Sequence, residues 1–230
     1  MANRNLELLT SVARLLRPLL NDLVFVGGCT TALLITDEAA AEVRPTYDVD
    51  SIARITSYAE YAAFSERLRR LGFAEDHSDG APICRWTHGE IRLDVMPTDE
   101  RILGFSNRWY ISAMESAQEV QLESDLTIRV VTAPFFLGTK LEAFKGRGNA
   151  DYFASHDLED VIAVIDGRPS LLRELQHSPN ELKIYVAGEV RKLIGKQEFM
   201  DALPGYLLPD PASQARLGIL LETLQKMASL

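Results

Sequence analysis

The chain has 230 residues, of which 47% are hydrophobic and 25% charged, the composition of an ordinary folded protein with one large domain or two small ones. Its net charge of -9 argues against a broad nucleic-acid-binding surface, although a local basic patch is compatible with it. Two cysteines, Cys29 and Cys84, are too few for a disulfide framework, and no stretch approaches the roughly 18 to 20 apolar residues that span a bilayer.

Helices and strands alternate in the first part of the chain. Residues 5–17 have the apolar period of a helix. Charged residues interrupt that pattern and no small-residue cleavage site follows, so we expect a surface helix and a cytoplasmic protein. The next predicted elements are a buried strand at 23–26 that ends at Gly27-Gly28, a short helix at 30–35, a loop at 37–46 and a strand at 47–55.

A capped helix and a hairpin follow. Ser57 and Glu60 form a capping box that opens the helix, and Gly72 closes it. Residues 83–87 and 90–96 predict two strands joined by a tight turn at His88-Gly89. A further strand is predicted at 127–132.

From Pro134 onward the pattern is helical. The predicted helices cover 134–146, 155–166, 170–176, 180–196 and 212–228. The sequence therefore predicts a mixed α/β part over residues 1–132 and an all-helical part over residues 133–230.

Asp48 and Asp50 are the first candidates for chemistry. Side chains alternate along a strand, so both carboxylates point to the same face. Two such charges ~4 Å apart cost about 4 kcal/mol at an effective dielectric near 20, so the pair needs a cation or a shared proton. Hard oxygen ligands at this spacing suit Mg²⁺. Alone, the motif is weak, because two aspartates on a solvated loop usually have no such role.

Asp94 supplies a third carboxylate. In the strand at 90–96, Ile91, Leu93 and Val95 share one face, and Arg92 and Asp94 share the other. Three carboxylates on neighbouring strands are typical of two-metal phosphoryl transfer. The alternative is a surface aspartate on the open face of an antiparallel sheet.

Gly27-Gly28 lies between a strand and a helix. Such a turn lets backbone N–H groups approach phosphate oxygens at a helix N-terminus. A plain strand-to-helix turn explains the same two glycines when they are considered alone.

Taken together, these parts resemble the nucleotidyltransferase superfamily, whose members have a glycine turn, an aspartate pair and a third strand carboxylate. The form Arg44-Pro-Thr46-Tyr-Asp48-Val-Asp50 resembles the AbiEii-type toxins, which include the MenT-like proteins. Two further motifs are similar to that family's, and they are Pro134-Phe-Phe-Leu-Gly-Thr-Lys140 and His156-Asp157-Leu-Glu-Asp160. His156 stands where the family usually has Arg or Lys.

The resemblance implies a polymerase-β-like α/β (α+β) core with a mixed sheet, and a helical C-terminal domain that completes the active-site cleft. The implied catalytic residues are Asp48, Asp50, Asp94, Lys140, Asp157 and Asp160. The implied nucleotide-binding residues are Gly27, Gly28, Thr30, Arg44, Thr46 and Lys140. The implied metal ligands are Asp48, Asp50 and Asp94, holding one or two Mg²⁺ ions beside an NTP co-substrate.

Simpler explanations exist for the residues of the helical part. A lysine beside an apolar stripe, as Lys140 is, usually extends its amino group to solvent. Asp157 falls in the first turn of a helix whose N-cap is Ser155, where a carboxylate is favoured by the helix dipole alone.

Three functions compete. The first is transfer of a nucleotide to an RNA, most plausibly the 3′ end of tRNA, by a toxin with a cognate antitoxin protein and no membrane partner. The second is modification of a small cationic molecule such as an aminoglycoside, which the negative net charge favours. The third, a non-enzymatic binding protein, fits poorly because all three acidic residues are kept. Candidate RNA contacts are Arg44, Lys145, Arg147, Arg191 and Lys192.

Overall fold

The computed structural model describes residues 3–148 and 151–230, and the chain divides into two units. The first unit contains residues up to Ala32 and from Arg44 to Thr132. The second contains Leu33–Val43 and Ala133–Leu230. The predicted α/β part begins with residues 1–2, which lie outside the described residues. None of the described helices is long and apolar enough to cross a bilayer.

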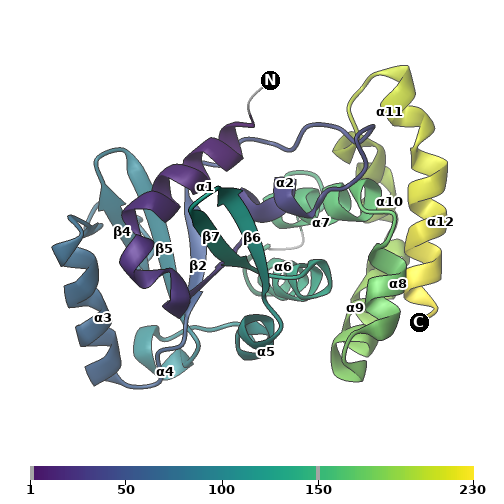
Figure 1. Cartoon of the computed structure of the whole chain (residues 1–230). Helices are drawn as coiled ribbons and strands as arrows, with labels where there is room; N and C mark the ends of the chain where they lie inside the picture. The colour runs from purple at the N-terminus through teal and green to yellow at the C-terminus, as the bar shows by residue number, and fades with distance from the viewer. Residues whose placement is uncertain (1–2, 149–150) are drawn as a thin grey trace. The chain divides into compact units, whose positions relative to one another are not determined.

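A mixed seven-stranded sheet forms the first unit (Figure 1). Its spatial order is β3-β4-β5-β2-β1-β7-β6. The strands are β1 (Leu23–Val26), β2 (Val49–Ala53), β3 (Ala74–Glu75), β4 (Arg85–His88), β5 (Ile91–Pro97), β6 (Gln118–Glu123) and β7 (Leu126–Val130). The pairs β2–β5 and β1–β7 are parallel, and the other neighbours are antiparallel. The unit has the α/β fold with a mixed sheet that the sequence predicts.

The central strands owe their place to apolar side chains. All four residues of β1 are buried, as are Val49, Ile52 and Ala53 of β2. Burial on both faces is typical of the middle of a sheet that is covered by other elements. A polar side chain in these central strands therefore points to a specific role. Asp50 on β2 and Asp94 on β5 are two such residues, and they are register partners.

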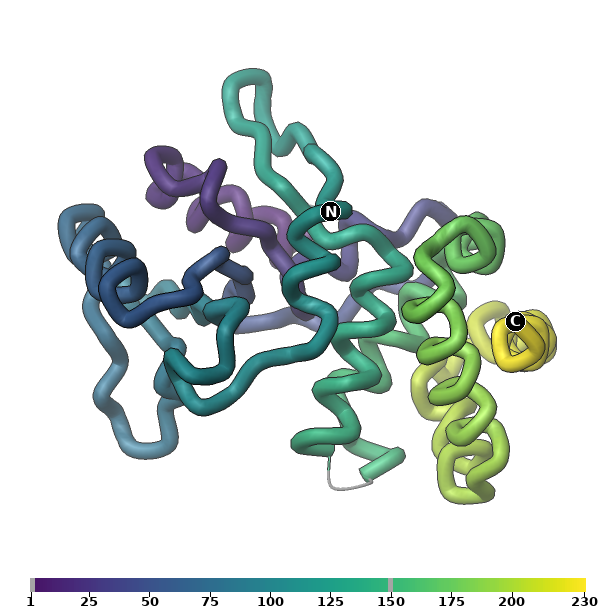
Figure 2. The backbone as a smooth tube through the Cα atoms, turned by 90° about the horizontal axis from the view of Figure 1, so that it is seen from below, coloured from purple at the N-terminus to yellow at the C-terminus, as the bar shows by residue number. Residues whose placement is uncertain are grey.

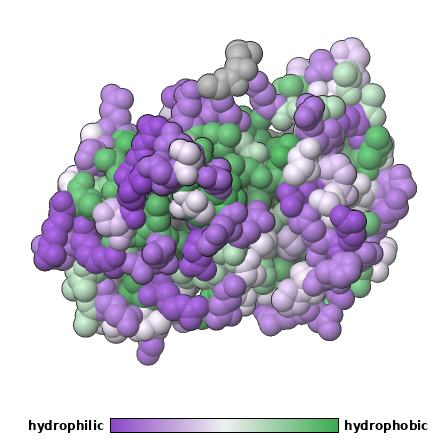
Figure 3. Space-filling model, viewed as in Figure 1, coloured by the Kyte–Doolittle hydropathy of each residue, from purple (hydrophilic) through white to green (hydrophobic). Residues whose placement is uncertain are grey.

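The helices of the first unit are short apart from two. They are α1 (Arg4–Leu15), η1 (Arg17–Asp22), η2 (Gly28–Thr30), α3 (Tyr58–Arg70), α4 (Glu100–Leu103) and α5 (Tyr110–Glu115), and α2 (Thr31–Leu34) follows η2 at the point where the chain passes to the second unit. Helix α1 lies across the sheet, in contact with β2, β5 and β7 (Figure 1). It buries Leu9 and Val12, as its predicted apolar face requires, and the outer surface in this view is mostly hydrophilic (Figure 3).

Helix α3 begins as predicted. The Ser57 hydroxyl accepts from the Glu60 N–H at 3.2 Å, whereas the Glu60 carboxylate accepts from the Thr56 N–H at 2.7 Å. The chain leaves this helix through Gly72, whose φ of 86° is left-handed.

The second unit is helical. Its elements are α6 (Ala133–Arg147), α7 (His156–Gly167), α8 (Leu171–His177), α9 (Asn180–Ile194), α10 (Gln197–Ala202), η3 (Leu203–Tyr206), α11 (Pro211–Ala215) and α12 (Leu217–Ala228). Helices α9 and α12 lie side by side in both ribbon and tube views (Figures 1 and 2). Their contact buries Val186, Val190 and Leu224 among other apolar side chains.

Residues 33–43 are held to the second unit by polar contacts. The backbone N–H groups of Thr36 and Asp37 both donate to the Gly167 carbonyl. The Arg216 guanidinium pairs with Asp37 at 2.7 Å and with Asp166 at 2.9 Å. The sequence predicts the end of a short helix and a loop here, and no attachment to the helical unit.

Several elements differ from the sequence prediction. The helix expected at 212–228 is two helices that meet at Arg216, whose side chain turns back to Asp166. Strand β6 is not predicted from the sequence, because four of the six residues in its sequence, QEVQLE, are polar. It lies at an edge of the sheet, where polar and charged residues are common. The short elements β3, α4, α5 and α10 have too few residues for a clear apolar period.

Candidate active site

The turn after β1 brings Gly27 against an acidic side chain. Gly27 has φ 72° and ψ -168°, a region open essentially to glycine. A Cβ built on Gly27 would lie 1.9 Å from Asp50 Oδ2, so any larger residue would collide with that carboxylate. The first glycine of the predicted pair therefore makes room for Asp50.

The three predicted acidic residues come together at one end of the central strands. Asp50 pairs in parallel register with Asp94, which places both side chains on one face of the sheet. Asp48 precedes β2, and its carboxylate shares a partner with Asp94. Asp94 is 6% exposed, and the other two carboxylates are partly exposed.

That shared partner is Arg85, which the sequence analysis missed. Its Nε donates to Asp94 Oδ1 and its Nη2 to Asp94 Oδ2, both at 2.8 Å. The same Nη2 donates to Asp48 Oδ2 at 2.8 Å. The hydrogen bond to Asp94 and the nearby carboxylates raise the pKa of the Arg85 guanidinium. The predicted turn at His88-Gly89 would set Arg85 opposite Arg92, whereas the observed pairing of His88 with Ile91 sets Arg85 opposite Asp94.

A polar chain from α1 supports Asp48. The Thr46 hydroxyl donates to Asp48 Oδ1 at 2.9 Å. The buried Asn5 side chain accepts from the Thr46 N–H and donates to the Arg44 carbonyl, each at 2.9 Å. Asn5 thus fixes the segment that carries the predicted Arg44 and Thr46, and no motif in the sequence points to it.

The threonines after the glycine turn are both buried. The Thr30 hydroxyl donates back to the Gly27 carbonyl at 2.9 Å, so it stabilises the turn. The Thr31 hydroxyl has no hydrogen-bond partner among the described residues. Thr30, the predicted nucleotide ligand, uses its hydroxyl inside the turn in this structure.

Lys140, Asp157 and Asp160 form a second charged cluster, in the helical unit. The Lys140 amino group lies 3.1 Å from Asp157 Oδ1 and 2.6 Å from Asp160 Oδ2. All three side chains are less than 10% exposed. Lys140 therefore does not extend to solvent, and Asp157 does more than cap its helix.

Arg147 completes this second cluster. It donates to both oxygens of Asp157, at 3.1 and 3.0 Å. Burial opposes the charged form of Asp157, but the Arg147 hydrogen bonds and the charge of Lys140 outweigh it, so the pKa of Asp157 lies below its ordinary value. His156, in the position where a basic residue is expected, is instead exposed and contacts Glu159 at 3.2 Å.

The remaining candidate RNA contacts are engaged with neighbours. Lys192 pairs with Glu189 at 2.8 Å, and Lys145 lies 3.5 Å from the same carboxylate. The Arg191 guanidinium donates to the Ala228 carbonyl. These positive charges are partly compensated within their own unit.

The carboxylates of the first unit suit a hard cation by their chemistry. In the described parts of the chain, however, no group of three or more His, Cys, Asp or Glu side chains is arranged to hold a metal ion. The reason is visible in the contacts, because Asp48 and Asp94 turn toward Arg85 while Asp50 lies against Gly27. The carboxylate oxygens are nevertheless the kind of ligand that Mg²⁺ prefers.

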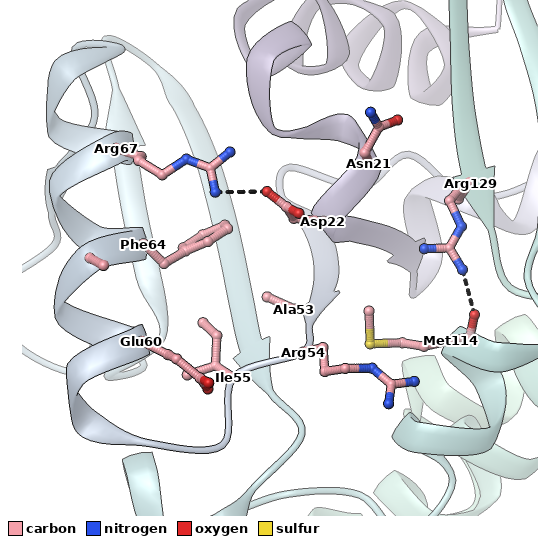
Figure 4. Close-up of a pocket in the computed structure, with 11 residues that line it drawn as sticks. Asn21, Asp22, Ala53, Arg54, Ile55, Glu60, Phe64, Arg67, Met114 and Arg129 are labelled. Atoms are coloured by element: carbon pink, nitrogen blue, oxygen red, sulfur yellow. Dashed lines mark hydrogen bonds and ion pairs between the residues drawn. The ribbon is translucent and has the colours of Figure 1, made fainter.

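A cavity of about 460 Å³ lies at the opposite end of β2 (Figure 4). It contains none of the predicted site residues. Its arginines are used internally, since Arg67 pairs with Asp22 at 2.7 Å and Arg129 donates to the Met114 carbonyl at 2.6 Å. The cavity therefore does not compete with the carboxylate cluster as the candidate site.

Cys29 and Cys84 are both buried, and neither forms a disulfide within the described residues. Burial, followed by the nearby Asp94 and Asp50 charges, raises the pKa of the Cys84 thiol to about 12. The Cys84 thiol therefore stays protonated at neutral pH and packs as a buried side chain.

No family model matches the chain, and no curated protein matches it in sequence. Among solved structures, it is similar to an antigenic nucleotidyltransferase-like protein from Paracoccidioides brasiliensis, with a TM-score of 0.52 and 18% identity over 87% of this chain and 94% of that one. JHP933 from Helicobacter pylori aligns over 97% of this chain and 94% of its own, at 10% identity and a TM-score of 0.44, too low to establish a common fold. The chain thus has the fold of a nucleotidyltransferase-like protein.

Proposed function

We propose that the chain is a metal-dependent nucleotidyltransferase that moves a nucleoside monophosphate from an NTP to an acceptor hydroxyl. The observation that carries the proposal is the gathering of Asp48, Asp50 and Asp94 on adjoining strands of a nucleotidyltransferase-like fold. The glycine turn at Gly27 lies against one of these carboxylates.

The reaction assigns each part a task. The acceptor oxygen bonds to the α-phosphorus, the bond from that phosphorus to the bridging oxygen breaks, and pyrophosphate leaves. The acceptor proton passes to a carboxylate oxygen of the cluster. Asp48, Asp50 and Asp94 would hold one or two Mg²⁺ ions, which supply charge stabilisation for the attacking and leaving oxygens. Thr46 and Asn5 keep Asp48 in position.

Lys140 is proposed as a phosphate ligand, as the family resemblance implies. Its compact ammonium group suits a phosphate oxygen. Because Asp157 and Asp160 hold that group, phosphate binding would exchange one of these contacts for another of the same kind.

For the acceptor, we propose an RNA 3′ end, within a toxin–antitoxin or abortive-infection system. The support is the likeness of the Arg44-x-Thr46-x-Asp48 and Lys140 motifs to the AbiEii and MenT-like toxins. A single-stranded end needs few phosphate contacts, which reconciles this acceptor with a net charge of -9. A small cationic acceptor such as an aminoglycoside is the second candidate, and the same negative charge favours it.

Incubation with Mg²⁺, each labelled NTP in turn, and either total tRNA or an aminoglycoside mixture tests both levels of the proposal. Label that passes to tRNA and is lost in Asp48→Asn supports the RNA acceptor. Label on the aminoglycoside alone supports the second candidate, a small cationic acceptor. Absence of transfer to any acceptor, from a folded protein, contradicts the enzyme assignment.

A further inference from the structure

We propose that the Arg85 guanidinium occupies the metal position of the carboxylate cluster, and that divalent metal enters only when Arg85 transfers to the phosphates of the incoming nucleotide. This inference rests on the proposed function. It adds that Arg85 blocks metal binding at that site as long as no nucleotide is bound.

The position of one nitrogen carries the argument. Arg85 Nη2 lies 2.8 Å from Asp48 Oδ2 and 2.8 Å from Asp94 Oδ2, so it sits between the two carboxylates. A Mg²⁺ ion bound by those same oxygens at about 2.1 Å would need that space. Guanidinium and metal therefore exclude each other, by overlap and by like charge.

The oxygens that a metal would use are already hydrogen-bonded. Both oxygens of Asp94 accept from Arg85, and the two oxygens of Asp48 accept from Arg85 and from Thr46. Removing the guanidinium from this position breaks three charge-assisted hydrogen bonds at once. A hydrated metal ion alone brings no new acceptor for the displaced Arg85.

The charge balance shows why exchange is favourable once an acceptor arrives. Arg85 carries one positive charge against the two carboxylates that it contacts, Asp48 and Asp94, so these three residues keep one negative charge. A divalent ion in place of the guanidinium would balance both carboxylates. The phosphates of the nucleotide offer the paired oxygens that a guanidinium fork binds best. Metal and nucleotide should therefore bind cooperatively, with Arg85 as the link.

The test is titration of Mn²⁺, followed by the electron paramagnetic resonance signal of the free ion, with and without a non-hydrolysable NTP analogue. We expect weak binding to the wild-type chain alone and strong binding with the analogue. In Arg85→Ala, the affinity for Mn²⁺ alone should rise at least about tenfold, and the gain from the analogue should shrink. Asp94→Asn should remove Mn²⁺ binding in both backgrounds.

Arg92→Ala is the matched control. Arg92 is exposed and lies two residues before Asp94 on β5, so its removal takes the same charge from the same face. A general electrostatic effect would raise Mn²⁺ affinity equally in both variants, which would overturn the proposal. Arg85→Lys is a second variant in case Arg85→Ala misfolds, because it keeps the positive charge but loses the two-pronged guanidinium group. Its affinity for Mn²⁺ should fall between those of wild type and Arg85→Ala.

Two outcomes separate the role of Arg85 from the metal site itself. If Mn²⁺ binds in an Asp94-dependent manner but Arg85→Ala binds it no more tightly than wild type does, the role of Arg85 is wrong and the metal site stands. If neither protein binds Mn²⁺, even with the analogue present, the metal site itself is wrong, and the proposed function fails with it.

Discussion

Gly27→Ala should damage the first unit more than a simple change of backbone preference would. The φ and ψ of 72° and -168° cost a residue with a Cβ about 1 to 3 kcal/mol. The new Cβ would also lie 1.9 Å from Asp50 Oδ2, so the carboxylate must move. We expect a loss of at least ~2 kcal/mol in the free energy of unfolding, together with loss of nucleotide transfer.

Gly104→Ala is the matched control for this prediction. Gly104 also has a positive φ, 79°, but a Cβ there meets nothing within 4 Å. It should cost only about 1 to 2 kcal/mol and leave transfer intact. Urea unfolding followed by tryptophan fluorescence reports on the right unit, because Trp86 and Trp109 both lie in the first unit and are buried. If both variants lose equal stability and equal activity, the close approach of Asp50 to Gly27 is wrong.

Three further changes test the polar clusters. Lys140→Met removes the ammonium group shared by the buried Asp157 and Asp160, while Arg147 still pairs with Asp157, so the helical unit should lose about 3 to 5 kcal/mol by circular dichroism, and Asp160→Asn in the same chain should recover part of it. Because the pKa of Asp157 is lowered in the folded state, its ionisation stabilises the fold above the unfolded pKa of about 4, and that contribution is lost as pH falls through the folded pKa. The difference in free energy of unfolding between wild type and Asp157→Asn should therefore narrow below about pH 4 in acid titrations. A difference that does not change with pH would refute this. Asn5→Ala should cost ~1 to 3 kcal/mol and lower kcat, because it frees the backbone of Arg44, and unchanged kcat would remove Asn5 from the support of the site.

The parts of the fold that follow from local patterns are predictable from the sequence. The apolar run at β1 and the turn at Gly27 are where their residues indicate, and the predicted hairpin forms with its turn one residue later, at Gly89-Glu90. The strand β6 is not, because only Val120 and Leu122 of its six residues are apolar, too few to indicate a strand. Residues 33–43 belong to the helical unit, where Asp37 forms an ion pair with Arg216. Arg216 lies more than 170 residues away along the chain, so no local pattern predicts this contact.

The candidate site divides in the same way. Asp48, Asp50 and Asp94 could be found because strand alternation sets which face each carboxylate takes. Arg85 could not be identified, because the expected turn at His88-Gly89 pairs Arg85 with Arg92, and the observed turn lies one residue later along the chain. Asn5 could not, because its two contacts join a helix to a loop some 40 residues away.

Lys140 illustrates how burial changes the interpretation of a residue. From the sequence, a lysine beside an apolar stripe extends to solvent. In the structure, its amino group is enclosed by Asp157 and Asp160. The pairing depends on the approach of α6 and α7, which is a tertiary contact outside the reach of helix periodicity.

Pyrophosphate release with Mg²⁺, NTP and acceptor tests the central claim most directly, when measured on Asp48→Asn, Asp50→Asn and Asp94→Asn beside Glu90→Gln, an exposed acidic residue in the nearby turn. We predict that each aspartate change lowers kcat by at least ~10²-fold with the fold intact by circular dichroism, whereas Glu90→Gln keeps wild-type turnover. Near-normal turnover in any one of the three aspartate variants would contradict the assignment of these carboxylates as the catalytic centre.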